Sequence, residues 1–250
     1  MYIINTPLKK IKTIALFIFC SLTFNVYANE AEDWFDKGYA ASQLKDYKKA
    51  VKWYLKAAEQ GHADAQINLA LMYDIGQVVA QDYKRAAKWY LKAAEQGDAG
   101  AQFNIALLYK IGQGVPKDYE QAAKWYLKAA EQGHADAQYL LALLYKIGQG
   151  VPQDFKQAAK WYLKVAEQGP AGDQFFIADA QITLALMYSN GQGVMQSNKK
   201  SYIWNAIAAA NGYKSALKNR DINAKSLSPR GLKEAQEEAA KLYDKINSKK

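Results

Sequence analysis

Apolar side chains recur at three- and four-residue spacing along most of the chain, the pattern of α-helices that bury one face. In the segment 46–61 they cover two neighbouring sides: Ala50, Trp53, Tyr54, Ala57 and Ala58 on one, and Val51, Leu55 and Ala58 on the other. Lys52, Lys56 and Glu59 remain as a polar strip. A helix that is apolar over so much of its circumference must pack on more than one side.

Capping signals mark both ends of this helix. Asp46 is a candidate N-cap, and Gly61 is a candidate C-cap. A second helix is predicted for ADAQINLALMY, residues 63–73, closing at Gly76. In later copies the next loop reads GQGVP, where the glycines permit a positive φ and the proline stops the helix. The first loop reads GQVVAQ, with Val78 and Ala80 in the glycine and proline places, so we expect it to be the least well determined.

This pair of helices repeats along the chain. The block KWYLKAAEQG stands at 52–61, 88–97 and 124–133, and KWYLKVAEQG at 160–169. Units begin at Asp46, Asp82, Asp118 and Asp154 with a period of 36 residues, and a degenerate fifth begins at Ser197 after a fourth of 43 residues. A fixed period of this length predicts a stacked array of repeats.

The repeated pattern resembles a known family. A-x-A-Q-x-x-L-A-x-x-Y-x-x-G-Q-G-V-P-x-D-Y-x-x-A-x-x-W-Y-x-K-A-A-E-Q-G is similar to the Sel1-like repeat, a relative of the tetratricopeptide repeat, over residues 46 to about 247. The resemblance implies an all-α fold: a right-handed α/α superhelical solenoid of helix-turn-helix repeats with a C-terminal capping helix. Residues 29–45, with Trp34 and Gly38, resemble the first helix of a tetratricopeptide unit, and 46–227 form the array.

The last segment, 228–250, is predicted to be a capping helix with a basic tail. Ser228 is its candidate N-cap and Pro229 its first residue. In the fifth unit two positions of the polar strip become Ile203 and Ile207. The matching apolar stripe on the last helix is Leu232, Ala235, Ala239, Leu242 and Ile246. We therefore expect the last helix to cover both isoleucines, as the end of a solenoid requires.

Residues 1–28 have the pattern of a secretory signal peptide. Three lysines precede an apolar run from Ile14 to Tyr27, and Ala28 follows as a small residue for cleavage. We expect an exported protein, periplasmic or secreted; an uncleaved anchor is the alternative. Cys20, the one cysteine, lies inside this run, so the mature chain would have no disulfide and would be held together by burial alone.

Charge is unevenly distributed. Residues 29–197 hold 18 Lys and Arg against 19 Asp and Glu, whereas 198–250 hold 12 against 5. The basic C-terminal part could make a weak contact with an anionic surface, or it could simply be solvated. No nucleic-acid partner is expected.

Catalytic and metal-binding patterns are weak in this chain. His62 and His134 occupy the same place two repeats apart, too far to share a metal ion. Asp64, Asp136 and Asp179 are expected in the first turns of their helices, where a negative charge suits the helix dipole. We expect no enzyme activity, no metal and no cofactor. The alternative is an envelope hydrolase of the β-lactamase-like or peptidoglycan-acting type, which the naming of cysteine-rich relatives implies; their paired cysteines and a Ser-x-x-Lys motif are missing here.

Comparing the repeats separates shared positions from variable ones. The shared tryptophans are predicted to be structural core, with ligand stacking as the alternative: Trp53, Trp89, Trp125, Trp161 and Trp204. The variable positions are candidate binding residues: Ile67, Asn68, Asp74, Phe103, Asn104, Lys110, Tyr139, Lys146, Ile182 and Ser189. The resemblance to tetratricopeptide arrays places them on the concave surface, where another protein or peptide would bind.

Within that set, Phe103 and Tyr139 beside Lys110 and Lys146 would suit a peptide that carries carboxylates. Alternatively, the aromatic rings pack between repeats and the lysines are ordinary solvated charges. The fourth unit adds seven residues in AGDQFFIADAQITL. They would either extend the next helix by two turns, placing Phe175 and Phe176 at a rim, or form a loop over 170–177. If exposed, the two phenylalanines would be contact residues; if buried, they would fill a misfit between units.

Overall fold

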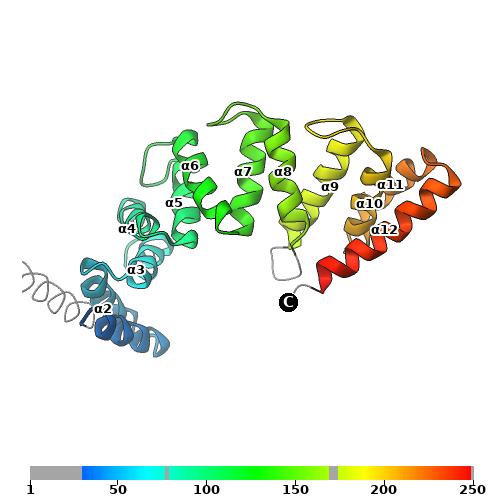
Figure 1. Ribbon diagram of the computed structural model, residues 1–250. Helices are drawn as coiled ribbons and strands as arrows, with labels where there is room; N and C mark the ends of the chain where they lie inside the picture. Colours follow the sequence, from blue (N-terminus) through cyan, green and yellow to red (C-terminus); the bar gives the residue numbers. More distant parts are fainter. Residues whose placement is uncertain (1–29, 77–78, 169–173, 249–250) are drawn as a thin grey trace, which may run out of the picture. The chain divides into compact units, whose positions relative to one another are not determined.

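The computed structural model describes residues 30–76, 79–168 and 174–248, and the regular structure in these ranges is entirely helical (Figure 1). Residues 30–43 are helical. The helices that follow are α2 (Tyr47–Glu59), α3 (Ala63–Ile75), α4 (Tyr83–Glu95), α5 (Ala99–Ile111), α6 (Tyr119–Glu131), α7 (Ala135–Ile147), α8 (Phe155–Ala166), α9 (Gln174–Asn190), α10 (Asn198–Ala210), α11 (Lys214–Lys225) and α12 (Pro229–Asn247). Within the described ranges no helix is both long and apolar enough to cross a bilayer. The expected signal peptide, Val78 and residues 170–173 of the insertion lie outside the described residues.

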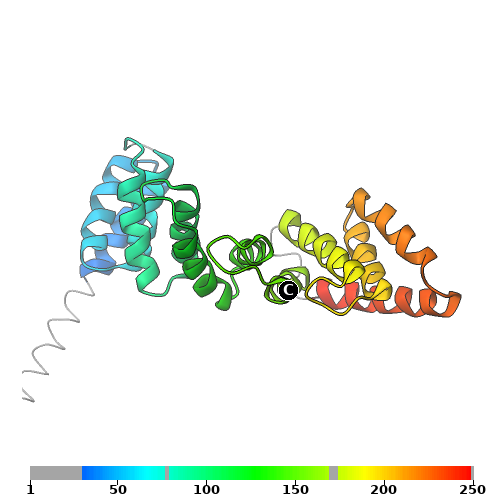
Figure 2. The ribbon, with the colours of Figure 1, turned by 90° about the horizontal axis from the view of Figure 1, so that it is seen from above.

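The helices form two compact units, and the division falls within α5. The first unit comprises the described residues up to Ala101 with 113–115, and the second comprises 102–112 with 116 onward. In the first unit α3 packs against α2 and α4. In the second, α6 to α11 pack in chain order and α12 returns onto α10 (Figure 2). Within each unit, helices that are neighbours in sequence are thus neighbours in space, which confirms the predicted all-α solenoid with a capping helix.

Asp46 is an N-cap as predicted, and later helices are capped at the same position. Side chains at the same register position accept a backbone N–H from the first turn of the tryptophan-bearing helices α2, α4, α6, α8 and α10: Asp46, Asp82, Asp118, Asp154 and Ser197. The Ala-Gln helices α3 and α7 end at Gly76 and Gly148, each left-handed with φ 74. Helix α3 extends to Ile75, two residues beyond the predicted end, because no residue before Gly76 breaks the helix.

Aromatic side chains of the tryptophan-bearing helices fill the core. The equivalent tyrosines are fully buried: Tyr54, Tyr90, Tyr126 and Tyr162. Four of the predicted core tryptophans are buried as well: Trp89, Trp125, Trp161 and Trp204. Trp53 differs, because it is only half-buried and lies under the ammonium groups of Lys37 and Lys56, at 5.3 and 4.8 Å from the ring centroid.

Lysines of the polar strip lie over the tryptophan rings. The Nζ atom of Lys128 is 4.0 Å from the Trp125 ring centroid, and that of Lys164 is 4.3 Å from Trp161. A cation over an aromatic face is a favourable contact. The repeated lysines therefore shield the edge of the core and remain in solvent.

A row of glutamine side chains connects successive repeats. The amide of Gln96 donates to the Gln66 carbonyl oxygen at 2.8 Å, and Gln168 donates to Gln138 at 2.9 Å. Gln132 to Gln102 repeats this bond at 2.8 Å. The acceptor glutamines are buried, and a buried amide is stable only when it is hydrogen-bonded. This explains why glutamine recurs at both positions of every full repeat.

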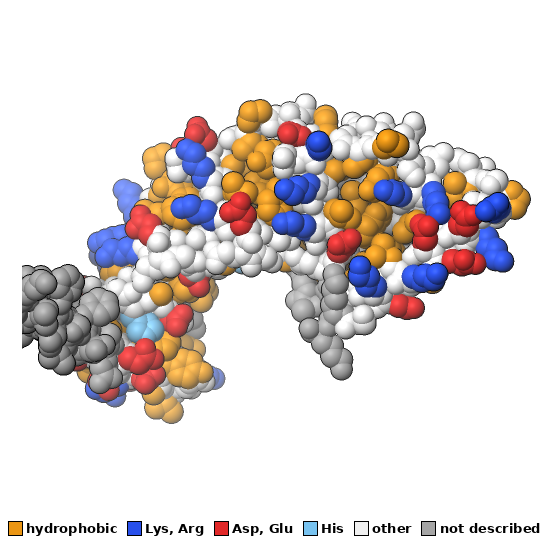
Figure 3. Space-filling model, viewed as in Figure 1, with side chains coloured by type: hydrophobic (Ala, Val, Ile, Leu, Met, Phe, Trp, Pro, Cys, Tyr) orange, Lys and Arg blue, Asp and Glu red, His pale blue; other side chains and the backbone are white. Residues whose placement is uncertain are grey.

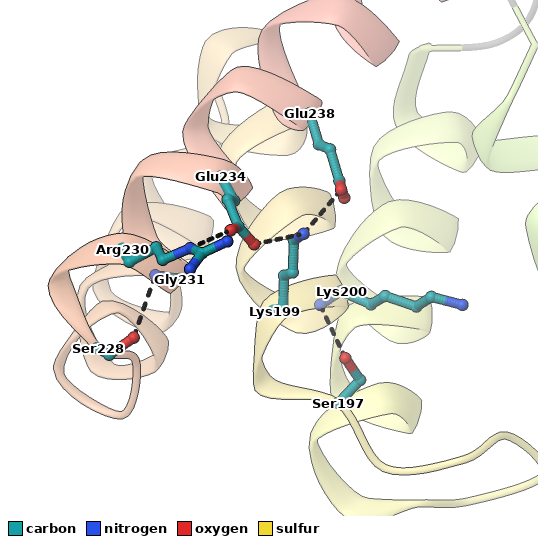
Figure 4. Close-up of polar contacts among 8 residues, drawn as sticks. All are labelled: Ser197, Lys199, Lys200, Ser228, Arg230, Gly231, Glu234 and Glu238. Atoms are coloured by element: carbon teal, nitrogen blue, oxygen red, sulfur yellow. Dashed lines mark hydrogen bonds and ion pairs between the residues drawn. The ribbon is translucent and has the colours of Figure 1, made fainter.

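The expected terminal cap is confirmed. Ile203 and Ile207 are 5% and 1% exposed, and Leu242 of α12 lies beside Ile203. Figure 4 shows the polar edge of this contact: the Lys199 ammonium pairs with Glu238 at 2.7 Å and with Glu234 at 3.5 Å. At the start of α12, Ser228 Oγ accepts from the Gly231 N–H at 3.1 Å, with proline in the first turn as predicted.

Candidate functional site

The predicted binding residues lie at the border between core and solvent. All ten are half-buried: Ile67, Asn68, Asp74, Phe103, Asn104, Lys110, Tyr139, Lys146, Ile182 and Ser189. Leu140 and Thr183, which share the variable position of Asn68 and Asn104, are buried. The variable positions therefore mix surface residues with packing residues.

Phe103 is engaged in contacts between repeats. Its ring stacks on His134 with centroids 4.7 Å apart and lies 5.9 Å from Tyr126. His134 is in turn the N-cap of α7, because its Nδ1 accepts from the Ala137 N–H at 3.4 Å. In the first unit His62 has the same two roles, capping α3 and stacking on Phe35 at 4.5 Å. The two histidines therefore serve helix ends, a role that the sequence did not reveal.

Tyr139 is engaged in the same way. Its hydroxyl donates to Asp179 Oδ2 at 2.7 Å, and its ring stacks on Phe176 at 4.6 Å. Burial, and then the Asp179 carboxylate, raise the pKa of Tyr139 above its usual value. Together with the contacts of Phe103, this geometry favours the packing alternative for the aromatic pair.

The insertion lengthens α9 at its start, one of the two predicted alternatives. Helix α9 has 17 residues where α7 has 13, so the described part adds one turn, 174–177, where two were expected. Asp179 consequently lies in the second turn of α9, and the prediction that it lies in the first turn is wrong. Phe175 is 64% exposed at the new end, whereas Phe176 is half-buried against Tyr139.

Lys110 and Lys146 are half-buried lysines that form no ion pair with the described residues. The equivalent residue in the first unit is Asp74, which accepts from the Tyr90 hydroxyl at 3.5 Å. Burial raises the pKa of the Asp74 carboxyl, and the Tyr90 hydrogen bond opposes this shift. The two lysines thus remain candidates for pairing with a ligand carboxylate.

A row of aliphatic residues, which the sequence analysis missed, lies on the same helices. In the second unit this aliphatic row consists of Leu107, Leu143, Leu186 and Ile222, one from each of α5, α7, α9 and α11. Leu186 and Ile222 are 53% and 54% exposed. Ile111 and Ile147 are exposed one turn later. The leucine is identical in all four full repeats, and such invariance usually indicates packing. The one sequence signal for exposure is that these helices are apolar on nearly every side, so some apolar residues must face solvent.

The charges near the aliphatic row are mostly positive. Its helices carry Lys110, Lys146, Lys218 and Lys225 at the variable positions. Of their acids, Asp136 lies in the first turn of α7, Asp179 is bound by Tyr139, and Asp221 is bound by Arg220 at 2.7 Å. Apolar and cationic groups together suit an apolar peptide that carries carboxylates.

The excess positive charge of the C-terminal part lies on α10 and α11. Helix α12 balances four basic residues with four acidic ones, and Figure 3 shows both signs at that end of the molecule. Helices α10 and α11 carry six basic residues against Asp221 alone. The expected contact with an anionic surface stays a prediction, and it would involve the fifth repeat more than the last helix.

The titratable side chains that gather around one cavity form hydrogen bonds and an ion pair with one another. In the first unit a cavity is lined by Tyr73, Asp82 and Arg85, where Asp82 caps α4 and pairs with Arg85 at 3.2 Å. Arg85 also donates to the Tyr73 hydroxyl at 3.3 Å. Across the described ranges, no group of three or more His, Cys, Asp or Glu side chains is arranged to hold a metal ion.

Comparison with known proteins agrees with this architecture. The Sel1 repeat matches residues 31–62, 63–98, 99–134, 135–170 and 178–213. The chain is similar to c5321, a protective antigen of uropathogenic Escherichia coli strains with an SLR fold, at 34% identity over 86% of this chain and a TM-score of 0.68; it spans 46% of that structure's length. A Sel1 repeat protein from Oxalobacter formigenes is 33% identical over 84% of this chain and 87% of its own, with a TM-score of 0.67. No protein with a curated description matches.

The matches cover five consecutive repeats. The glutamine row and the buried aromatic side chains join the same helix pairs. The chain belongs to the Sel1 repeat family.

Proposed function

We propose that this protein is an exported, non-catalytic scaffold that holds a peptide segment of another protein on the Ala-Gln helices of its second unit. Sel1 repeat proteins are protein-interaction scaffolds and are generally not enzymes. The finer proposal concerns where the partner binds and in which compartment. The ligand would be a peptide with apolar side chains and carboxylates.

The aliphatic row carries this proposal. A monomeric protein normally buries most of its large aliphatic side chains, and an ordered line of exposed ones marks an interaction surface. Leu143, Leu186 and Ile222 occupy one register position on successive Ala-Gln helices; Leu186 and Ile222 are exposed, and Leu143 is half-buried. Lys110 and Lys146 lie three residues beyond the leucines of their own helices and have no ion-pair partner among the described residues.

Export is supported by the pattern of residues 1–28: lysines, a short apolar run and a small residue before Asn29. A partner would then be met in the periplasm or outside the cell. N-terminal sequencing of protein recovered from these fractions tests this point, and a mature chain that begins at Asn29 is the expected result. Recovery of the full-length chain from the cytoplasm alone would refute export.

The binding site is tested by capture of partners from a cell-envelope fraction. The test variant is Lys110→Glu/Lys146→Glu, and the matched control is Lys128→Glu/Lys164→Glu, which changes charge equally on the opposite set of helices, beside Trp125 and Trp161. Proteins that bind the wild type and the control but not the test variant support the site. Equal capture by both variants would contradict it.

A further inference from the structure

The fifth repeat replaces three core residues with polar ones. Ser201 stands where the other repeats have alanine, and Asn205 where they have the fully buried tyrosine of Tyr54 and its equivalents. On the partner helix α11, Asn223 stands where they have methionine or leucine. All three residues are buried in the second unit, Asn205 to 2% exposure. Buried polar side chains that replace apolar ones require hydrogen-bond partners.

The three side chains bond to one another, but not completely. Ser201 Oγ donates to Asn223 Oδ1 at 3.0 Å, and Asn205 Nδ2 donates to the same oxygen at 3.2 Å. Asn205 Nδ2 also donates to the Ser201 carbonyl oxygen at 3.0 Å, which fixes the orientation of its amide. Asn205 Oδ1 is left buried without a partner among the described residues. An unsatisfied buried acceptor costs stability unless a donor reaches it.

These residues line a cavity that is open to solvent. Its volume is about 100 Å³, and Leu186, Ser189, Asn219 and Ile222 complete its wall. A cavity this size is larger than a single water molecule needs. Leu186 and Ile222 belong to the aliphatic row, so the mouth of the cavity lies on the proposed peptide surface.

The hydrogen-bonding groups of the cavity that have no partner determine which chemical group can bind in it. Asn205 Oδ1 requires a donor, and the Asn223 amide nitrogen is a donor that bonds to none of the described residues. A carboxamide offers both a donor and an acceptor at adjacent atoms. A carboxylate lacks the donor, and an aliphatic group lacks both.

We propose that the Ser201, Asn205 and Asn223 cavity is a specificity pocket for a glutamine or asparagine side chain of the bound peptide. This inference rests on the proposed function, because the peptide on the aliphatic row would deliver that side chain. Its amide N–H donates to Asn205 Oδ1, and its carbonyl oxygen accepts from Asn223 Nδ2. The fifth repeat thereby adds sequence selectivity that the regular repeats cannot supply, since they fill the same space with tyrosine.

Small capped amino acids test the pocket without the natural partner. The probe is N-acetyl-glutamine methylamide, added to the ¹⁵N-labelled protein while the side-chain amide signals of Asn205 and Asn223 are followed by NMR. The methionine derivative keeps the length and removes the hydrogen bonds, the glutamate derivative removes the donor, and the alanine derivative keeps only the backbone amides. Saturable shifts are expected with glutamine, and binding about tenfold or more weaker with the other three, as loss of one or two hydrogen bonds predicts.

Protein variants separate the pocket from general effects. Asn205→Leu keeps the size and removes the hydrogen bonds, and Asn205→Tyr restores the residue of the other repeats; both are expected to abolish binding of the glutamine probe. Asn190→Leu, at an exposed asparagine at the end of α9 outside the cavity, is the matched control and should bind normally. Asn205→Tyr should remain folded by thermal unfolding, because four repeats accommodate this tyrosine.

Three results would overturn the pocket: equal binding of the alanine and glutamine derivatives, retained binding in Asn205→Leu, or a crystal soaked with the probe in which only ordered water occupies the cavity. None of these bears on partner capture by the aliphatic row. Conversely, failure of the proposed function would appear as equal partner capture by Lys110→Glu/Lys146→Glu and its control, whether or not the glutamine probe bound to the cavity.

Discussion

Gly150 and Gly133 offer a matched test of how the loops close each repeat. Both glycines have a positive φ, +70 and +93, so alanine is strained at either position. Their surroundings differ. A Cβ on Gly150 would lie 2.1 Å from the carbonyl oxygen of Tyr119, the first residue of α6, whereas a Cβ on Gly133 would meet nothing within 4 Å. The loop after α7 thus rests directly on the start of α6.

The magnitudes follow from these distances. The left-handed backbone costs alanine about 1–2 kcal/mol at both sites. Ordinary contact of a Cβ begins near 3.4 Å, so at Gly150 the loop must also move away from backbone atoms that have no flexible end to yield. Overpacking of this kind adds about 1–3 kcal/mol. Gly150→Ala should therefore destabilise the protein by about 2–5 kcal/mol, against about 1–2 kcal/mol for Gly133→Ala.

Chemical denaturation of the two variants measures the difference, and hydrogen exchange of the amides of α6 and α7 shows whether the loss is local. Local measurement matters because stacked repeats can unfold one after another. Equal destabilisation by the two substitutions, or faster exchange far from α6 in Gly150→Ala alone, would refute the reasoning that the loop packs on the helix start.

Three further predictions concern the core and the cap. Trp161→Ala should lower the free energy of unfolding by about 3–5 kcal/mol in chemical denaturation, and Trp53→Ala should lower it clearly less, because Trp53 is only half-buried. Equal losses would contradict the role of burial. Burial raises the pKa of Tyr126 above its ordinary 10.0, so its contribution to stability is complete below pH 10.0 and is lost as pH rises further. The tyrosinate absorbance that the wild type shows in excess of Tyr126→Phe should appear only together with loss of the helical circular dichroism signal; an excess that appears in folded protein would be contrary. Deleting α12 should expose Ile203 and Ile207 and so increase binding of an apolar dye. Replacing both isoleucines with lysine, the residue of the other repeats, should remove this increase, and unchanged dye binding after the deletion would show that α12 does not cover them.

Local signals in the sequence were sufficient to predict the fold. Asp46 and Ser228 are N-caps as predicted, because capping depends on residues within a few positions of the helix start. Ile203 and Ile207 break a repeated polar strip, and the last helix carries a matching apolar stripe, so the sequence predicts that this helix covers them. Comparison of the repeats with one another shows which positions they share.

The candidate site was harder to predict because it depends on contacts between repeats. Phe103 and Tyr139 are variable and aromatic, yet His134 and Phe176 of the next repeat engage them, and no local pattern identifies those partners. Leu143 is invariant, yet its helix turns it toward the surface. On a helix that is apolar on most sides, packing decides which apolar residues remain exposed.

The most direct test of the account is the affinity of a purified partner segment for the variant Leu143→Asp/Leu186→Asp, measured by calorimetry. Leu186 is largely exposed and Leu143 half-buried, so the variant should retain its helical circular dichroism signal. If the aliphatic row is the binding surface, two carboxylates beside the partner's own should weaken binding by about 100-fold or more. An unchanged affinity in the folded variant would contradict the central claim.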